Sequence, residues 1–553
     1  MSSHFDLPDT YTEFPPAFLT VTACNDWLAS VPMANPSQAQ VMLLRQLNLL
    51  HRFSLASSTR LKLLEAIRQT VIEVQRDVAK KFANKPLPLS PPEQSALDGT
   101  MAVWQALLLG YLRLFDAVAT GDAEVAGQGA LIAQRALSVF ADWEVDLCRG
   151  EKLPDGSFWR RLHSVFALAE KLKFTTIEVR DAARHGNEPT NVVSAYAEAH
   201  LLHAASPFEL PSRHLDWIAR WSRRWGNKVS LSTHGAPTDG SRASPLFVDI
   251  ESDRPAGYIA RDVPGARWLD TDELRKSIKA RLVMLQQGEL PAHLHLGEDC
   301  TQPATSLLLE RVYQRWCKGG AKRKHDRRPV SGGCEFIVGF EAVHYYLSGR
   351  KPFHPPAVDS TMLREERDEM ATFGQRPRHQ DENYSDTHGY QVESWSLIDD
   401  WQLLDQSANG VRLQRPLKVG VRVGSGQLIA IKLGGSTRFM VGGVRWILQE
   451  DGETPTVSIG IQLFPGSALP VAVRVIDPKS NEPYHQGMRL PAMPAVHEPE
   501  AIIVPAGTFR IGRIIDMFNE GHIDRAKLLH VLDRGNEFER CTFEIVAAKT
   551  KPV

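Results

Sequence analysis

Residues 456–464 read TVSIGIQLF, and apolar residues alternate there with small or polar ones. In an extended chain, successive side chains point to opposite sides. One side would then carry the apolar positions Val457, Ile459, Ile461 and Leu463. The period of two predicts a β-strand with one buried face.

Several short apolar runs surround this strand and are separated by glycine-rich turns. They lie at residues 419–423, 428–433, 439–447 and 471–475. Short strands at such spacing are typical of small antiparallel barrels. A barrel also leaves no exposed sheet edge.

Toward the C-terminus the strand pattern continues beyond a polar connector. Residues 501–518 and 538–546 are strand-like, and residues 523–532 between them have helical spacing. We expect residues 477–553 to extend the barrel or to form a small cap.

On the other side of the strands, residues 322–328 read KRKHDRR and are flanked by paired glycines at 319–320 and 332–333. Such a run by itself is typical of a solvated surface or a nucleic-acid patch. A second polar motif follows at residues 405–410, DQSANG, between two strand candidates. These are also the residues that β-turns prefer.

Taken together and in order, these motifs resemble the PilZ domain family. The resemblance covers residues 314–474 and rests on Arg323-x-x-x-Arg327, a strand at 334–340, Asp405-x-Ser407-x-x-Gly410, and the strands VRWI at 444–447 and GIQLF at 460–464. It implies a six-stranded barrel that binds cyclic di-GMP. The implied ligand-binding residues are Arg323, Arg327, Arg328, Asp405, Ser407 and Gly410.

The chemistry of these side chains suits that ligand, which carries two phosphates and two guanines. Arginine guanidinium groups pair bidentately with phosphate or with guanine O6 and N7. Asp405 can accept hydrogen bonds from guanine N1 and N2, Ser407 can bind guanine or phosphate, and Gly410 permits close backbone approach. Lys324-x-x-x-Arg328 overlaps the first motif, so Arg328 can share the role of Arg327. Residues 351–394, rich in charge and proline, separate the two motifs and are expected to form a mobile insertion.

The first 225 residues predict a helical domain. Their apolar positions recur at steps of three and four, as in the stripe Leu61, Leu64, Ile67, Val71, Val74 and Val78. Trp217, Trp221 and Trp225 form a second stripe, which we assign to the domain core rather than to a partner groove. Residues 226–313 are expected to be a small mixed module with a linking helix.

Composition limits the other possibilities. The 64 Lys and Arg residues balance 65 Asp and Glu, so the net charge of −1 does not favour nucleic acid as a partner. The six cysteines are scattered, which favours buried thiols in a reducing compartment. His293, His295, Glu298, Asp299 and Cys300 lack a recognisable zinc spacing, so we assign them a structural or surface role.

We therefore predict a multidomain α+β protein with an all-helical N-terminal domain, a small mixed α/β module, and a C-terminal antiparallel PilZ-like β-barrel at 314–476 with extra strands. No secretory leader, membrane span or catalytic motif is found in the sequence, so we expect a cytoplasmic protein that is not an enzyme and needs no cofactor. Its ligand is expected to be cyclic di-GMP and its partner a protein that contacts the helical domain. The alternative is a degenerate PilZ-like scaffold or chaperone-like protein that binds no nucleotide.

Overall fold

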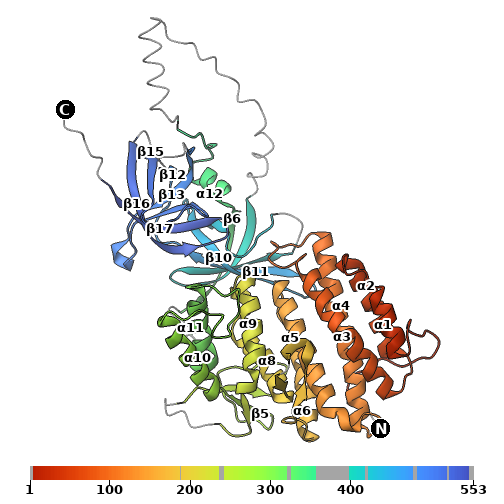
Figure 1. Cartoon of the computed structure of the whole chain (residues 1–553). Helices are drawn as coiled ribbons and strands as arrows, with labels where there is room; N and C mark the ends of the chain where they lie inside the picture. Colours follow the sequence, from red (N-terminus) through yellow and green to blue (C-terminus); the bar gives the residue numbers. More distant parts are fainter. Residues whose placement is uncertain are drawn as a thin grey trace, which may run out of the picture. The chain divides into compact units, whose positions relative to one another are not determined.

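The computed structural model describes residues 4–186, 188–235, 242–320, 326–356, 398–417, 421–476, 482–519 and 522–546. Two compact units divide the chain (Figure 1). The first consists of Met1–Lys85 and Leu89–Lys324, and the second of Pro86–Pro88 and His325–Val553. Arg323 and most of the expected insertion at 351–394 lie outside the described residues.

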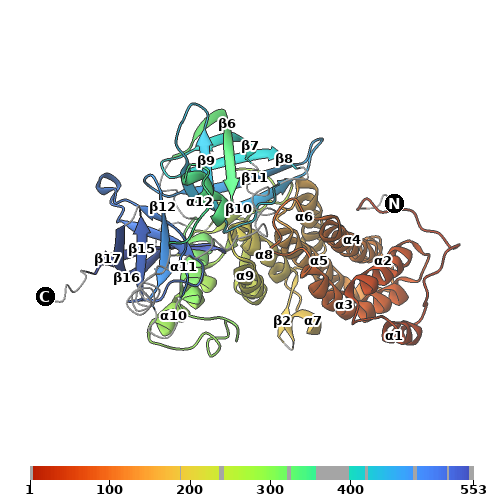
Figure 2. The ribbon, with the colours of Figure 1, turned by 90° about the horizontal axis from the view of Figure 1, so that it is seen from above.

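The first unit begins with helices that pack on one another, and Figure 2 shows α2, α3, α4 and α5 side by side. A two-stranded sheet, β1 (Val179–Arg180) with β2 (Pro189–Thr190), interrupts the helical order. The helices are α1 (Val21–Ala29), α2 (Pro36–Arg52), α3 (Ser57–Ala79), α4 (Pro91–Ala119), η1 (Ala126–Gln128), α5 (Gly129–Arg149), α6 (Gly156–Lys171), α7 (Ala182–His185), α8 (Val192–Ala204), η2 (Pro207–Glu209), α9 (Ser212–Trp225) and η3 (Gly226–Lys228).

Both apolar stripes predicted from the sequence are confirmed as core. Every residue of the α3 stripe is at most 8% exposed. In α9, Trp217, Trp221 and Trp225 are each at most 1% exposed. The indole Nε1 of Trp217 donates to Asp299, and that of Trp221 donates to the carbonyl of Leu296. The tryptophan stripe therefore fixes the segment that contains Leu296 and Asp299 onto α9.

Helix α4 is the one described helix long and apolar enough to cross a bilayer by length and composition. Its most apolar window is 61% buried inside the protein, where α4 packs against α2, α3 and α5. The start of α4 is set by Pro91 at the first helical position and by the Glu93 carboxylate, which accepts from the backbone N–H of Ser90 at 2.7 Å. These features are those of a core helix.

The segment after α9 forms a mixed module within the first unit. Its antiparallel sheet has the order β3-β5-β4, and its two helices pack on each other. The indole of Trp316 donates to the carbonyl of Leu201 in α8 at 2.7 Å, which ties the module to the helical core. The elements are β3 (Ser230–Ser232), β4 (Leu246–Asp249), β5 (Ala266–Asp270), α10 (Asp272–Gln286) and α11 (Ala304–Cys317).

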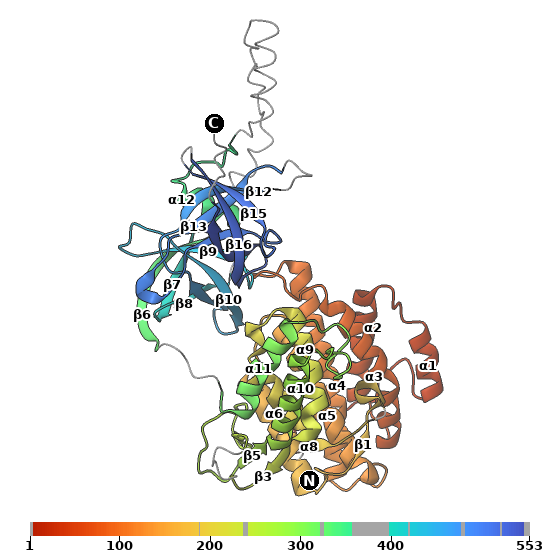
Figure 3. The same cartoon turned by 60° about the vertical axis from the view of Figure 1, so that its left-hand side comes forward.

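The second unit contains the predicted six-stranded barrel. Its strands close in the order β10-β11-β8-β7-β6-β9, and every neighbouring pair is antiparallel (Figure 3). Helix α12 (Phe340–Leu347) follows the first strand. The strands are β6 (Arg328–Val338), β7 (Asp399–Gln406), β8 (Gly410–Pro416), β9 (Leu428–Leu433), β10 (Met440–Glu450) and β11 (Thr456–Leu463).

Two details of this barrel differ from the prediction. The described residues of the expected strand at 419–423 form only an isolated bridge, between Val423 and Leu87. Strand β11 is also buried on both faces at its centre, since Ser458 is fully buried. The reason is that the outer side of β11 is covered by neighbouring side chains, with Gln414 reaching Ser458 Oγ at 3.2 Å.

The remaining strands close into a second barrel, whereas the sequence predicted only an extension or a cap. Their order is β12-β13-β14-β17-β16-β15, and the run at 471–475 belongs to this barrel rather than to the first. The predicted helix at 523–532 is wrong, because this segment is strand β16, paired with β15 and β17. The elements are β12 (Leu469–Val475), β13 (His485–Leu490), η4 (Pro494–Val496), β14 (Ala501–Pro505), β15 (Ile514–Asn519), β16 (His522–Arg534) and β17 (Phe538–Ile545).

A shared hydrophobic cluster joins the two barrels and includes α12. The rings of Phe464, after β11, and Phe538, in β17, lie 5.7 Å apart. The Glu537 carboxylate accepts from the backbone N–H of Leu428 at 2.8 Å. The two barrels therefore support each other through packing and a direct hydrogen bond.

All six cysteines are buried, as the sequence predicted. Burial raises the pKa of the thiols of Cys317, Cys334 and Cys541 to about 12. Such thiols remain protonated and unreactive near neutral pH.

Candidate functional site

Arg327 and Asp405 are brought together by the pairing of β6 with β7. Arg328 and Pro329 at the start of β6 lie opposite Gln406 and Asp405. The Arg327 guanidinium donates to the Asp405 carboxylate, with 2.8 Å between Nη1 and Oδ1. Their side chains are 33% and 21% exposed, so both remain within reach of a ligand.

The turn between β7 and β8 holds Ser407 and Gly410 close to this ion pair. The backbone N–H of Ser407 donates to the carbonyl of Gly410 at 2.8 Å, and its hydroxyl donates to the same oxygen at 3.2 Å. A Cβ at residue 410 would stand 3.2 Å from the carbonyl oxygen of Ile461. Glycine at this position therefore lets the turn lie directly against β11.

The two other predicted arginines are placed differently. Arg328 is exposed at the start of β6, next to Arg327, and forms no ion pair with any described residue. Arg323 lies outside the described residues, so the structure does not place it. Five of the six predicted residues are described: Arg327, Arg328, Asp405, Ser407 and Gly410.

Strand register extends the site across the outer face of the barrel. Asp405 lies opposite Arg412, Arg412 lies opposite Gly460, and Gly460 lies opposite Trp446. Directly opposed residues project on the same face of a sheet. A Cβ at residue 460 would stand 2.0 Å from Nε1 of Trp446, so the indole lies against the backbone of β11. This row presents a carboxylate, a guanidinium and an aromatic ring on one surface.

A parallel polar row lies beside it. Gln462 is opposite Gly410, and its Oε1 accepts from Nε of Arg445 at 2.8 Å. Arg412 itself donates to Glu450 at 3.2 Å. We did not predict Arg412, Trp446 or Gln462 as site residues. Trp446 and Gln462 stand inside motifs that the sequence displays, but only the strand register shows that they face the Asp405 turn.

The residues first considered as a metal set have other roles. Asp299 accepts from Trp217 Nε1 and from Arg220, both at 2.7 Å. His293 pairs with Glu289 at 3.5 Å, and the thiol of Cys300 donates to the carbonyl of Leu296 at 3.3 Å. Within the described ranges, no group of three or more His, Cys, Asp or Glu side chains is arranged to hold a metal ion.

Comparison with protein families gives three matches in chain order. Residues 22–238 match the model described as the N-terminal domain of the cyclic-di-GMP receptor FimW. Residues 246–399 match the middle PilZ domain of that receptor. Residues 471–546 match its C-terminal β-barrel domain. The PilZ match begins in the mixed module at β4 and ends at the first residue of β7, so it includes Arg327 but not the Asp405 turn.

A curated relative matches along most of its length. It is the cyclic-di-GMP receptor FimW of Pseudomonas aeruginosa, which is 23% identical over 543 residues that span 91% of this chain and 86% of the relative. The second barrel thus corresponds to a domain of its own in this relative. The chain is thus similar to this receptor in three successive regions, with a region that matches a PilZ domain between a helical domain and a second barrel.

Proposed function

We propose that this chain is a receptor for cyclic di-GMP, which it binds on the outer face of the first barrel. The observation that carries the proposal is the Arg327–Asp405 ion pair beside the Ser407–Gly410 turn. The name of the relative and the PilZ match support the same ligand.

The ligand can replace both partners of that ion pair at once. Its phosphates or the guanine O6 and N7 atoms accept from the guanidinium of Arg327, and the guanine N1 and N2 groups donate to Asp405. Arg328 is the next residue and has no ion-pair partner among the described residues. Its guanidinium supplies a second pair of N–H donors for phosphate. Ser407 supplies a short polar contact at the turn.

The row beyond Asp405 provides the planar groups on which a base can stack. Guanine bases stack on aromatic rings and on guanidinium planes. Trp446 lies partly exposed against Gly460, and Arg412 stands between it and Asp405. In this proposal Trp446 and Arg412 stack on the face of a guanine base. Asp405 accepts hydrogen bonds from the N1 and N2 groups of the same base.

The receptor transmits the level of cyclic di-GMP to a protein partner that contacts the helical domain. The chain acts in the cytoplasm, performs no catalysis and needs no resident cofactor. Ligand binding changes the equilibrium between two conformations because the ligand contacts the Arg327–Arg328 segment differently in each of them.

Isothermal titration of cyclic di-GMP into the full chain tests the proposal. Replacing Asp405 or Arg327 by Ala should weaken binding by about tenfold to a hundredfold, which corresponds to the 1–3 kcal/mol of one bidentate contact. Asp400→Ala, on the same strand, and Arg438→Ala, in an exposed turn of the same barrel, are matched controls and should bind as the unaltered chain does.

Absence of binding by the folded, unaltered chain would refute the proposal and favour the scaffold alternative. Binding that is unchanged in both Arg327→Ala and Asp405→Ala would place the ligand elsewhere. Trp446→Ala separates stacking from edge recognition, because it should lower the affinity while discrimination between guanine and adenine analogues is retained.

A further inference from the structure

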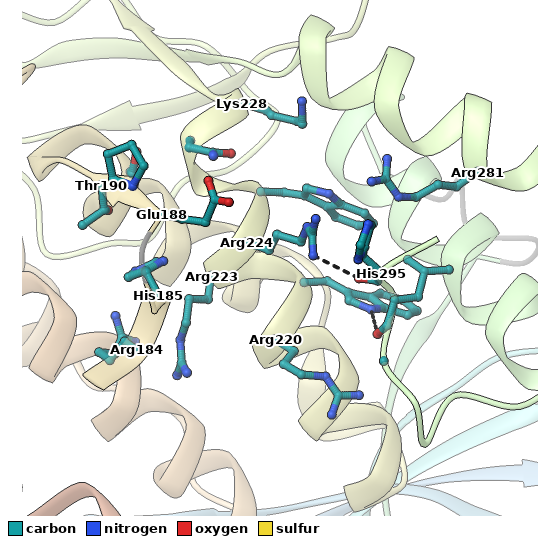
Figure 4. A pocket seen from close by; sticks show the side chains of 17 residues that line it. Arg184, His185, Glu188, Thr190, Arg220, Arg223, Arg224, Lys228, Arg281 and His295 are labelled. Carbon is teal, nitrogen blue, oxygen red and sulfur yellow. Dashed lines mark hydrogen bonds between the residues drawn. The ribbon is translucent and has the colours of Figure 1, made fainter. Parts of the chain in front are cut away.

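A pocket of about 640 Å³ lies in the first unit, far in sequence from the barrel site. It is formed by α7, β2, the start of α8, the C-terminal half of α9, η3, α10 and the loop after α10 (Figure 4). Its volume falls in the range of small-molecule sites. The lining contains six cationic side chains, Arg184, Arg220, Arg223, Arg224, Lys228 and Arg281, and one carboxylate, that of Glu188.

Three of these cations are already neutralised by carboxylates. Arg184 and Arg223 share Asp142 and Glu198, with N–O distances between 2.8 and 3.3 Å. Arg220 pairs with Asp299 at 2.7 Å. These side chains form one wall of the pocket and are held in place by their partners.

The other three cations have no carboxylate partner among the described residues. Among the described residues, the side chain of Arg224 donates only to the carbonyl of His295, at 3.4 Å. Arg281 donates to the hydroxyl of Ser277 at 2.6 Å and to the carbonyl of Leu294 at 3.1 Å. The side chain of Lys228 makes no hydrogen bond within the described part of the chain. Figure 4 shows Arg224, Arg281 and Lys228 around the same space, from α9, α10 and η3.

Repulsion between Arg224 and Arg281 is a cost that an anion would reduce. Burial, and then the positive charge of Arg224, lower the pKa of Arg281. Two donors in the lining also lack a partner among the described residues, namely Nε1 of Trp225 and Oγ1 of Thr190, in residues that are 1% and 3% exposed. An unpartnered buried polar group costs about 1–3 kcal/mol, so donors of this kind favour a ligand rich in acceptors.

We propose that this pocket binds a small ligand that carries a diphosphate group. Three unneutralised cations call for at least two negative charges close together, and guanidinium forks match phosphate oxygens bidentately. A diphosphate supplies both, and it is small enough for a pocket of about 640 Å³. The same chemistry is found in free pyrophosphate and in nucleoside diphosphates. This site is separate from the barrel site and does not depend on the function proposed above.

The test is calorimetric titration of the full chain with inorganic pyrophosphate at low ionic strength. We expect binding to one site. Lys228→Gln and Arg224→Gln should each weaken it about tenfold, which is about 1.4 kcal/mol. Glu188→Gln should strengthen it, because it removes the one carboxylate of the lining. Lys279→Gln, an exposed position of α10 outside the lining, is the matched control and should change nothing.

Further titrations distinguish between the possible ligands and between the two possible binding sites. Tighter binding of GDP or ADP than of pyrophosphate would identify a nucleotide, and the reverse would identify the free anion. Succinate or polyglutamate binding as tightly as pyrophosphate would overturn the diphosphate assignment. Pyrophosphate binding that is lost in Arg327→Ala but unchanged in Lys228→Gln and Arg224→Gln would overturn the location. The side chain of Lys228 is exposed and makes no hydrogen bond or ion pair with any described residue, so its variant should remain folded.

Discussion

Arg327 donates to Asp405 over 2.8 Å between Nη1 and Oδ1, although 78 residues separate them in the chain. The contact exists because β6 and β7, on either side of the long intervening segment, are paired strands. Its two side chains are 33% and 21% exposed, and such partly solvated ion pairs contribute little to stability. The pair is therefore available for binding at a small cost in folding energy.

The first prediction concerns that cost. In the absence of ligand, a double-mutant cycle of Arg327→Ala and Asp405→Ala should give a coupling energy of at most about 1 kcal/mol in the free energy of unfolding. Urea unfolding of the four proteins measures it. A coupling well above that value would mean that the pair holds the barrel together, and the loss of ligand affinity in the single variants would then have a structural cause.

The second prediction concerns the contact between Gly460 and Trp446. Gly460→Ala should destabilise the protein by about 1–3 kcal/mol, since the new methyl would collide with the indole at 2.0 Å. Trp446→Ala in the same chain should relieve most of this loss, which thermal unfolding would detect. Gly332→Ala is the control, because a Cβ at that position of β6 meets nothing within 4 Å. Equal effects of both glycine substitutions would contradict the proposed packing.

The third prediction concerns the buried ion cluster of the helical domain. Arg184, with a side chain 1% exposed, binds both Asp142 and Glu198. Arg184→Met should lower the free energy of unfolding by about 3–5 kcal/mol, because it leaves buried carboxylates with less compensation. For comparison, Arg160→Met removes an ion pair to Asp253 that is 66% and 49% exposed and should cost less than about 1 kcal/mol. The opposite order of the two effects would refute this account.

The fourth prediction concerns pH. Burial lowers the pKa of His51 to about 4, and the nearby charges of Arg52, Arg113 and Arg60 add to this shift. An unfolded histidine titrates near pH 6.5. Between pH 6.5 and pH 4 the unfolded chain therefore takes up a proton that folded His51 does not, and stability falls as the pH falls.

In a His51→Gln variant this part of the pH dependence should be missing. The loss of unfolding free energy between pH 7 and pH 4 should be smaller by about 2–3 kcal/mol than in the unaltered chain. His485→Gln, at an exposed position, serves as the control. If His51→Gln and the unaltered chain lose the same free energy on acidification, His51 does not titrate in this way.

The local sequence pattern was sufficient to predict the buried positions wherever the packing follows directly from that pattern. The α3 stripe and the tryptophans of α9 face the core because a helix turns every third or fourth residue to the same side. The order of Arg327, the Asp405 turn and the strand at 456–464 was also sufficient to recognise that the chain contains a PilZ domain, for which residues 246–399 are the matched region. Neither conclusion required knowledge of the contacts between segments that are distant in the sequence.

Strand β16 shows where local pattern was insufficient. Its register with β17 shifts between Leu528 and Val531 and again between Val531 and Asp533. Each β-bulge inserts a residue and breaks the period of two, so the apolar positions acquire helix-like spacing. Pairing with β15 and β17 on both sides outweighs this local signal.

The residue types and their spacing along the chain therefore decided the helical core, the presence of a barrel and the chemistry of the candidate ligand residues, because these depend on short-range periodicity and motif. The second barrel, the row from Asp405 through Arg412 to Trp446, and the convergence of Arg224, Lys228 and Arg281 on one pocket were decided by tertiary contacts. They arise from strand register and helix packing between distant segments, and the energy of those contacts exists only once the chain has folded.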